Sequence, residues 1–394
     1  MNVAYINGKI LTWARQRAGF EIARLAKGKV TIEKLRAWES GDEHPSQAQA
    51  IELADRLGIS YAMLFMPEVP ETDTIPLPDL RTIVGGPIVN PSLDFREVVG
   101  DTLVRQDWVR EERIEFEQPQ LEFVGRFSIA DSPQDVAADM RRVLGITAQD
   151  RIKCADYEAF IKHLGLRAEA AGILVMRSAV VRHITSRPLS VEEFRGFALA
   201  DAYAPVVFVN DSDAKAAQVF TIAHELAHIW IAEDGVSDRR PNQNGDSKNA
   251  IEIFCDRVAA EFLAQEQEFK QIWGTSSVMD NARRAARHFR VSTLVALRRA
   301  KDLKLITFQS FLENVNAEYD RFREIDRRKR EEQKKKENKG GNFWASFQIR
   351  NGNTLNATVV SALVNRRTTY TEAAGLLGLT TNSTIRYLRR VGAG

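Results

Sequence analysis

The sequence predicts an α+β protein in which helical parts precede and follow a small sheet. Three observations carry this prediction: short helices punctuated by glycines over residues 9–66, strand-like apolar runs between residues 173 and 210, and a charged helical stretch after residue 313. At 394 residues the chain exceeds what one hydrophobic core usually serves, so two or three domains are expected.

The N-terminal residues 1–70 are typical of a compact helical domain. Its short helices end at left-handed positions that glycine favours, namely Gly19, Gly28, Gly41 and Gly58. Repeated prolines over residues 67–81 then favour an extended linker. Residues 92–117 return to helical spacing, so residues 71–130 are predicted to be a linker and a connecting helix.

The central segment, residues 131–312, has a mixed pattern. Its first helix begins with a Ser132 cap and with Pro133 in the first turn. After a helix over residues 156–172, three segments have strand composition: 173–181, 196–201 and 204–210. We expect the last of these strands to offer an open edge on which an extended peptide could pair.

The C-terminal part is predicted to be a long charged helix, residues 313–341, followed by a small basic helical module, residues 342–394. Within the module, YTEAAGLLGLTTNSTIRYLRR has the outline of a helix-turn-helix. Residues 321–394 carry 16 Lys or Arg against 6 Asp or Glu, a net +10, whereas residues 1–70 carry 9 against 8, a net +1. A polyanion contact is therefore expected at the C-terminus, although the charged helix itself is typical of a solvated face.

The number of cysteines and the hydropathy of the chain indicate the cellular compartment. The chain has 2 cysteines, too few for a disulfide framework, and no apolar run of membrane-spanning length. Its first residues lack the apolar core of a signal peptide. A cytoplasmic protein without a membrane contact is predicted.

One short motif carries the chemistry. Residues 220–231, FTIAHELAHIWI, contain His224, Glu225 and His228 in the order His-Glu-x-x-His. Residues four apart differ by about 40° around a helix axis, so both imidazoles project from one face. They can take two corners of a zinc tetrahedron, while Glu225 takes a proton from metal-bound water.

Catalytic zinc needs a third protein ligand and one open position. Glu252 lies 24 positions beyond His228 on a second apolar-striped helix, residues 250–263, and can supply that ligand. Asp256 follows one turn later on the same face, where it can accept the free ring N–H of His224 or His228.

Each of these residues also has a purely structural interpretation. An HExxH match can arise by chance in an amphipathic helix. Cys255 is interpreted as a small buried residue rather than a zinc ligand. A donor that stabilises the tetrahedral intermediate is needed as well. Three residues are candidates for it, each of which could equally be structural: His183, Arg195 and Tyr203.

Several long segments of the chain resemble the ImmA/IrrE metallopeptidases, in the subset with an N-terminal XRE-type helix-turn-helix. The resemblance runs over nearly the whole chain, through RQRAGFEIARLA, LRAWESGDEHPSQAQAIELADRLG, LPDLRT, EEFRGFALADAYAPVVFVND, QVFTIAHELAHIW and IEIFCDRVAAEFLAQ. It implies a minimal, gluzincin-like zincin domain with Zn²⁺ held by His224, His228 and Glu252 and with Glu225 as the general base. Two departures are Cys255-Asp256, where the family usually has Ala-Asn, and FLAQEQ, where it usually has Leu-Met-Pro.

The resemblance also implies that the helix TIEKLRAWES would enter a DNA major groove. The exposed residues there would be Lys29, Thr31, Glu33, Lys34 and Arg36, and Trp38 would belong to the core. The same fold could instead dock another helix-turn-helix protein. A homodimer is a common state of such modules on palindromic sites.

The C-terminal module offers a second surface for nucleic acid or for an acidic protein partner. The arginines considered for it are Arg350, Arg366, Arg367, Arg386, Arg389 and Arg390.

We therefore expect a zinc-dependent, site-specific endopeptidase fused to a helix-turn-helix. The resemblance implies that its substrate is a helix-turn-helix repressor in a stress, mobile-element or toxin–antitoxin circuit. One rival is a transcriptional regulator or antitoxin whose zincin domain is a sensor with little proteolysis, and another is a general peptidase acting on small peptides. His and carboxylate ligands accept manganese as well as zinc.

Overall fold

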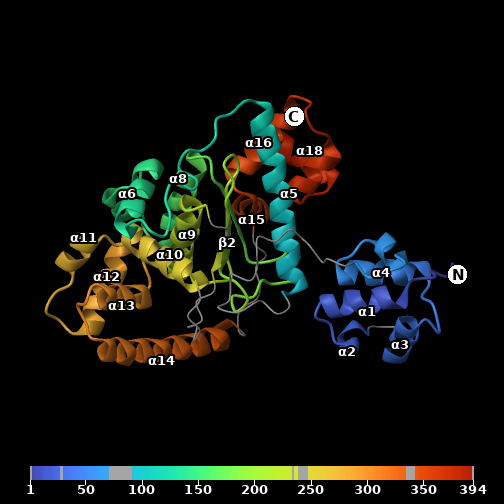
Figure 1. Cartoon of the computed structure of the whole chain (residues 1–394), viewed down its shortest axis with the longest axis horizontal. Helices are drawn as coiled ribbons and strands as arrows, with labels where there is room; N and C mark the ends of the chain where they lie inside the picture. The colour runs from blue at the N-terminus through green and yellow to red at the C-terminus, as the bar shows by residue number, and fades with distance from the viewer. Residues whose placement is uncertain are drawn as a thin grey trace. The chain divides into compact units, whose positions relative to one another are not determined.

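The computed structural model describes residues 2–26, 30–70, 91–232, 235–237, 247–333 and 342–392. These residues divide into two compact units, the first within residues 2–70 and 91–103 and the second from residue 104 onward. Both units are mostly helical, and a small mixed sheet lies in the second (Figure 1), which confirms the predicted α+β class. The predicted domain boundaries remain predictions. Within the described residues, no helix combines the length and the apolarity needed to cross a membrane.

The first unit is a set of short capped helices around its own core. Its elements are α1 (Gly8–Arg17), α2 (Ile22–Leu25), α3 (Ile32–Ser40), α4 (Gln47–Leu57) and the 3₁₀ helix η1 (Tyr61–Phe65). Gly41 and Gly58 adopt left-handed conformations after α3 and α4, as their positions in the sequence predicted. Leu35 and Trp38 are buried in the core, which confirms the prediction for Trp38.

A long helix, α5 (Leu93–Glu115), leads from the first unit into the second. The next helices are α6 (Pro133–Leu144), α7 (Ala148–Lys153) and α8 (Tyr157–Ala170). The side chain of Ser132 caps α6 and Pro133 occupies its first turn, as predicted.

The sheet of the second unit has the strand order β1-β3-β2-β4. Its strands are β1 (Leu174–Ser178), β2 (Gly196–Leu199), β3 (Val206–Asn210) and β4 (Gly235–Ser237). The β1 and β3 strands are parallel, whereas β2 is antiparallel to both β3 and β4. The expected open edge on residues 204–210 is therefore wrong, because β3 is central and is paired on both sides. Among the described strands, β4 is the edge strand that follows the motif helix.

Helices α9 (Lys215–Trp230) and α10 (Ser247–Leu263) lie against each other, and α9 packs on β2, β3 and β4. In Figure 1 both helices lie to the left of the labelled strand β2. The core beneath them includes Ala198 and Val207 from the sheet and Val219, Leu226 and Trp230 from α9. This packing holds the motif helix on one face of the sheet.

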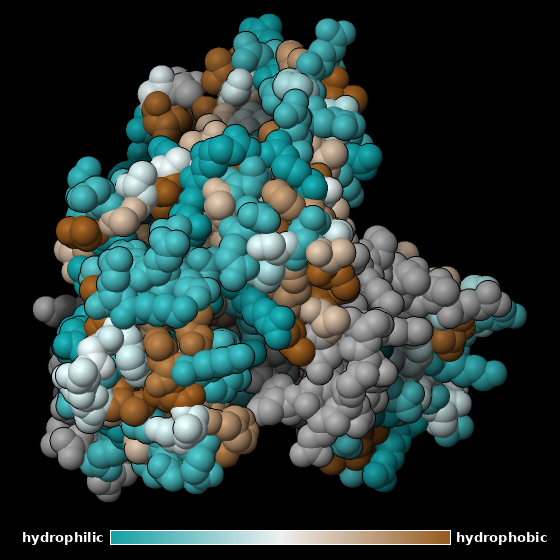
Figure 2. All heavy atoms as spheres, turned by 60° about the vertical axis from the view of Figure 1, so that its left-hand side comes forward, coloured by the Kyte–Doolittle hydropathy of each residue, from teal (hydrophilic) through white to brown (hydrophobic). Residues whose placement is uncertain are grey.

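The next four helices after α10 also belong to the second unit. They are α11 (Glu266–Ile272), α12 (Val278–Phe289), α13 (Thr293–Asp302) and α14 (Phe308–Gln333). The long charged helix therefore begins at Phe308, five residues before the predicted start at 313, and residues 334–341 of the prediction lie outside the described residues. Figure 2 brings this side of the molecule forward and shows a largely hydrophilic face with brown patches in its lower left part. Among the exposed hydrophobic residues of α14 are Phe308, Leu312, Tyr319 and Phe322.

The C-terminal module consists of α15 (Phe343–Asn351), α16 (Asn353–Val364), α17 (Tyr370–Leu377) and α18 (Thr381–Arg390). The predicted helix, glycine-containing turn and second helix are present as α17, Gly378 and α18. Helices α15 and α16 pack against β1. A Cβ on Gly352, which has φ +76°, would overlap the carbonyl oxygen of Val175, so the chain approaches this strand closely.

Candidate metal centre

The motif helix is buried over most of its length. Every residue from Gln218 to Trp230 is buried, because the helix is enclosed by the sheet and by neighbouring helices. The Gln218 amide anchors the first turn by donating hydrogen bonds to the carbonyl oxygens of Asp211 (3.2 Å) and Asp213 (2.8 Å). A helix held in this way can present side chains in fixed positions.

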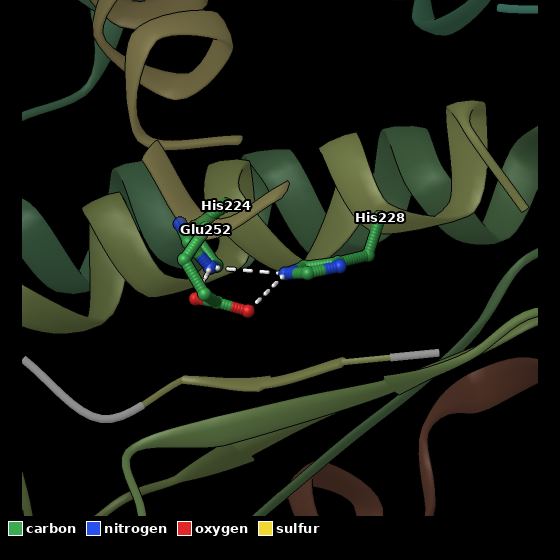
Figure 3. Close-up of side chains that lie close together, drawn as sticks. All are labelled: His224, His228 and Glu252. Carbon is green, nitrogen blue, oxygen red and sulfur yellow. Dashed lines mark hydrogen bonds and ion pairs between the residues drawn. The ribbon is translucent and has the colours of Figure 1, made fainter. Parts of the chain in front are cut away.

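His224, His228 and Glu252 converge, as Figure 3 shows. The Nε2 atoms of the two imidazoles are 3.1 Å apart. The Glu252 oxygens lie 3.1 Å from His224 Nε2 and 3.3 Å from His228 Nε2. The structure therefore brings the three predicted metal ligands together, two from α9 and one from α10.

These separations fit a zinc ion. Tetrahedral bonds of about 2.1 Å place neighbouring ligand atoms about 3.4 Å apart. The three separations lie within a few tenths of an ångström of that spacing. Both histidines present the Nε2 atom, and Glu252 places a different carboxylate oxygen near each of them. The Glu252 side chain remains 25% exposed, whereas those of His224 and His228 are 4% and 1% exposed. The fourth coordination position can therefore be open to solvent on the side of Glu252.

Asp256 fixes the orientation of the first imidazole. Its Oδ1 lies 3.1 Å from His224 Nδ1, so this ring can donate there and keep Nε2 free for a metal. The other carboxylate oxygen lies 3.0 Å from Arg298 on α13. The predicted position of Asp256 behind the metal ligands agrees with this geometry. No local pattern in the sequence indicated Arg298, which approaches Asp256 through the packing of α13.

The electrostatics of the cluster favour a positive charge among its members. Burial disfavours the charged form of His224, but hydrogen bonds to Asp256 and Glu252 outweigh burial and raise its pKa to about 10. The pKa of His228 is also raised above its usual value, because Cys255 and Glu252 outweigh its burial. Burial works against the charged form of Glu252, yet the two imidazoles lower its pKa well below the usual range. The carboxylates that stabilise a proton on the two imidazoles would also stabilise a metal cation bound between them.

Glu225 is completely buried and lies next to His224 in the chain. Its carboxylate points to β2, where a Cβ on Gly196 would lie 3.2 Å from Oε1. The same Cβ would lie 2.8 Å from the carbonyl oxygen of Phe208 and 2.6 Å from the Thr221 side chain. Glycine at position 196 is therefore what permits α9 and Glu225 to approach the sheet, a role that the strand pattern did not reveal.

Cys255 is a buried free cysteine close to His228. It is not a member of the ligand cluster found among the described residues. This is consistent with the interpretation of Cys255 as a buried residue beside the site rather than a ligand.

The three candidates for stabilising the intermediate are engaged elsewhere. His183 contacts the carbonyl oxygen of Gly378 and the Arg350 guanidinium in the C-terminal module. Arg195 forms an ion pair with Asp213 at 3.0 Å. The Tyr203 hydroxyl accepts a long hydrogen bond of 3.5 Å from Gln120. In the described contacts, none of the three side chains meets the metal ligands.

The predicted DNA-contacting residues of the first unit lie on α3 or just before it. Thr31, Lys34 and Arg36 are exposed, and Glu33 is exposed among them. The Thr31 side chain also caps α3 by accepting a hydrogen bond from the Lys34 amide. Lys29 lies outside the described residues.

The six arginines considered in the C-terminal module do not form one surface. Arg350 is buried and donates to the carbonyl oxygen of Arg182, and Arg367 pairs with Glu112. Both are therefore structural, which corrects the prediction. The remaining four are exposed: Arg366, Arg386, Arg389 and Arg390.

Comparison with known families locates the chemistry. Residues 168–301, from the end of α8 to α13, match the IrrE N-terminal-like domain. No curated protein matches the chain. The family match contains the two histidines, Glu225 and Glu252, and it begins after the first unit, so it gives no support to the XRE-type assignment.

Proposed function

Because residues 168–301 are a metallopeptidase domain with a zinc site, we propose that the protein is a site-specific endopeptidase acting on another protein in the cytoplasm. The observation that carries the proposal is the convergence of His224, His228 and Glu252. The buried Glu225 follows His224 directly in the chain. The substrate class that we favour is a helix-turn-helix regulator, in keeping with the family resemblance of the sequence.

Each residue of the site has a distinct role in peptide hydrolysis. When bound by the two histidines and Glu252, zinc supplies a Lewis acid that acidifies a coordinated water and polarises a carbonyl group. Asp256 holds His224 in the tautomer that leaves Nε2 free. Glu225 accepts the proton of the attacking water and passes it to the leaving amine.

The position of β4 supports an extended substrate. This strand is the edge strand on the β2 side of the sheet and it packs against α9. Figure 3 shows the short ribbon of β4, with grey ends, running beneath the three side chains. A substrate strand that pairs with its outer edge would pass the metal ligands with its carbonyl groups exposed.

The first unit can bring the enzyme to its target. Lys34 and Arg36 are exposed on α3 and could bind the phosphate backbone of DNA. The net charge of residues 1–70 is close to zero, however, and this is equally compatible with a protein partner. We propose that this unit binds DNA at the operator where the regulator sits. If it docks the regulator itself instead, Lys34→Ala and Arg36→Ala will weaken regulator capture and leave DNA binding unchanged.

Cleavage of a cognate regulator tests the activity. The full chain, loaded with zinc, is incubated with the small helix-turn-helix regulator encoded beside it, and the fragments are identified by mass spectrometry. We expect one discrete cut with wild type and at least a roughly thousandfold slower cut with Glu225→Gln, because the general base is lost while the ligands remain.

Two controls exclude a loss of zinc and a general effect of removing a carboxylate. Zinc content is measured for both proteins, and Glu122→Gln, a carboxylate that is 91% exposed, serves as the matched variant. Equal cleavage by wild type and Glu225→Gln would refute the assigned role of Glu225. A zinc-loaded wild type that binds the regulator but leaves it whole would instead favour the sensor or antitoxin function.

A further inference from the structure

The C-terminal module contains a helix pair with the geometry of a helix-turn-helix. The first helix, α17, is capped by Thr369, whose hydroxyl accepts from the Glu372 amide at 3.1 Å. Gly378 follows with φ +64°, and Thr380 caps α18 by accepting from the Ser383 amide at 3.2 Å. Three residues, 378–380, thus join two helices through a left-handed turn.

The second helix of the pair has an inner face and an outer face. Thr384, Tyr387 and Leu388 are buried and hold α18 to the module. The exposed residues of the opposite face are Thr381, Asn382, Arg386, Arg389 and Arg390. Positions 382, 386 and 389 follow helical spacing, so Asn382, Arg386 and Arg389 share one exposed stripe.

Charge distinguishes this stripe from an ordinary solvated helix. Residues 342–392 contain 6 Arg and no Lys against one acidic residue, Glu372, and α18 itself has no acidic residue. Arg386 and Arg389 form no ion pair with any residue that the structure describes, whereas Arg390 lies over the Trp344 ring. Guanidinium groups left without carboxylates are available to an external partner.

The other side of the helix pair contacts residues elsewhere in the second unit. Arg105 donates to the carbonyl oxygen of Leu376 at 2.9 Å, and Asn351 donates to that of Leu377 at 3.0 Å. His183 contacts the carbonyl oxygen of Gly378. These contacts hold α17 and the turn against α5, α15 and the segment between β1 and β2, and they leave the outer face of α18 exposed.

We propose that this face of α18 reads double-stranded DNA in the major groove. An α-helix fits that groove, and Asn and Arg are the side chains that recognise adenine and guanine edges with paired hydrogen bonds. The exposed start of α17, with Thr369 and Tyr370, would lie near the phosphate backbone, as the first helix of such a pair does. An acidic protein would be attracted by the charge but would not require Asn382 on the same stripe.

The proposal makes DNA recognition part of the peptidase unit. Helix α16 is joined to α8 through Glu169, whose carboxylate accepts from the Asn353 amide group (2.7 Å) and from the Thr354 backbone (2.9 Å). The DNA-reading helix and the metal centre are then parts of one compact unit. A regulator bound at a neighbouring DNA site would be presented to this peptidase at a defined distance.

Selection from a random 30-base-pair pool with the full chain tests the proposal. We expect wild type to enrich one sequence. We expect Arg386→Ala to weaken binding to that duplex by about tenfold or more, since a paired contact to a base is lost. Arg386→Lys keeps the charge, so it should retain binding to random duplex but lose the sequence preference.

Arg323→Ala, which removes an arginine that is 80% exposed on α14, is the charge-matched control. Arg36→Ala on α3 reports on the first unit, and each variant must keep the thermal midpoint of wild type. Three results would overturn the proposal. One is a selected sequence whose binding depends on Arg36 but not on Arg386, which would assign the reading to the first unit. The others are equal binding by wild type and Arg386→Ala, and binding of poly-glutamate as tight as that of duplex, which would indicate an acidic protein partner.

Discussion

At the scale of single residues, Asp256 tests how far the metal centre depends on its surroundings. Its carboxylate lies between His224 Nδ1 and Arg298 and so orients one ligand. We expect Asp256→Asn to weaken zinc binding by about 10- to 100-fold, the usual cost of losing such a partner. Competition with a chromophoric chelator measures it.

The control for this prediction is Asp320→Asn, which alters a carboxylate that is 73% exposed on α14. Unchanged zinc affinity in Asp256→Asn would mean that packing alone orients His224. A loss of affinity equal in both variants would mean that total charge, rather than the hydrogen bond, matters.

Gly196 carries a second prediction at this scale. A methyl group there would meet the Phe208 carbonyl and the Thr221 side chain, so Gly196→Ala must push α9 away from β2. We expect a loss of about 1–3 kcal/mol in the free energy of unfolding, typical of overpacking, together with slower peptide cleavage because Glu225 moves. Urea unfolding and the cleavage assay measure the two effects.

Gly375→Ala is the matched control, because a Cβ there meets nothing within 4 Å and the position is helical. It should leave stability unchanged or raise it slightly. If Gly196→Ala behaves in the same way, the close approach of helix and strand is not tight in solution.

Individual residues show what sequence can and cannot predict about the site. His224, Glu225, His228 and Glu252 could be found because their roles follow from spacing along two helices. Arg298, in contrast, reaches the site only through the packing of α13, which no local pattern specifies. The two interpretations of His183 could not be separated for the same reason, since its partners come from the C-terminal module.

At the scale of elements, Asp139 on α6 joins three segments. Its carboxylate accepts a hydrogen bond from Trp230 Nε1 at the end of α9 (2.9 Å) and from Arg126 (3.0 Å). Burial raises the pKa of Asp139, but its hydrogen bonds to Arg142 and Trp230 outweigh burial, so the pKa is lowered. The carboxylate therefore helps to hold the end of the motif helix.

The lowered pKa fixes the sign of a pH effect. The stabilising contribution of Asp139 is present above its unfolded value of about 3.9 and is lost as pH falls through the folded value. We expect Asp139→Asn to lower the free energy of unfolding by about 1–2 kcal/mol at pH 7 and the two proteins to converge in acid. Urea unfolding from pH 3 to 8 measures this.

Glu122→Gln is the control for Asp139, because Glu122 contacts the same Arg126 at 3.7 Å but is 91% exposed. A surface pair of this kind contributes little. A constant difference between Asp139→Asn and wild type at every pH would show that the carboxylate charge is not what stabilises the contact.

The elements themselves were more predictable than their arrangement. Strand composition located β1, β2 and β3, and capping residues located the start of α6. The order β1-β3-β2-β4 could not be predicted, because pairing between strands depends on contacts far apart in sequence. That is why β3 was wrongly expected at an edge.

At the scale of the whole molecule, each of the two units has a core. One core is formed by α1 to η1 and a separate one by the sheet and the helices around it. The residues that would hold zinc come from α9 and α10 of the second unit, so removal of the metal should destabilise that unit alone. We expect two calorimetric transitions, of which a chelator lowers only one.

The size of that shift follows from mass action. Zinc at 100 times its dissociation constant stabilises the folded form by about 2.7 kcal/mol. His228→Ala should abolish the shift, and a chelator that moved both transitions equally would show that the units unfold together.

The contact between Gly352 and β1 bears on the solubility of shortened proteins. The Leu174 amide bonds to Pro205 on the β3 side, so the neighbouring Val175 carbonyl faces the opposite way, toward Gly352. The C-terminal helices therefore cover a strand edge that would otherwise be free to pair with another chain. A protein ending at residue 341 would bare this edge, and its self-association, rather than any loss of zinc or of the motif helix, would limit how concentrated it could be made.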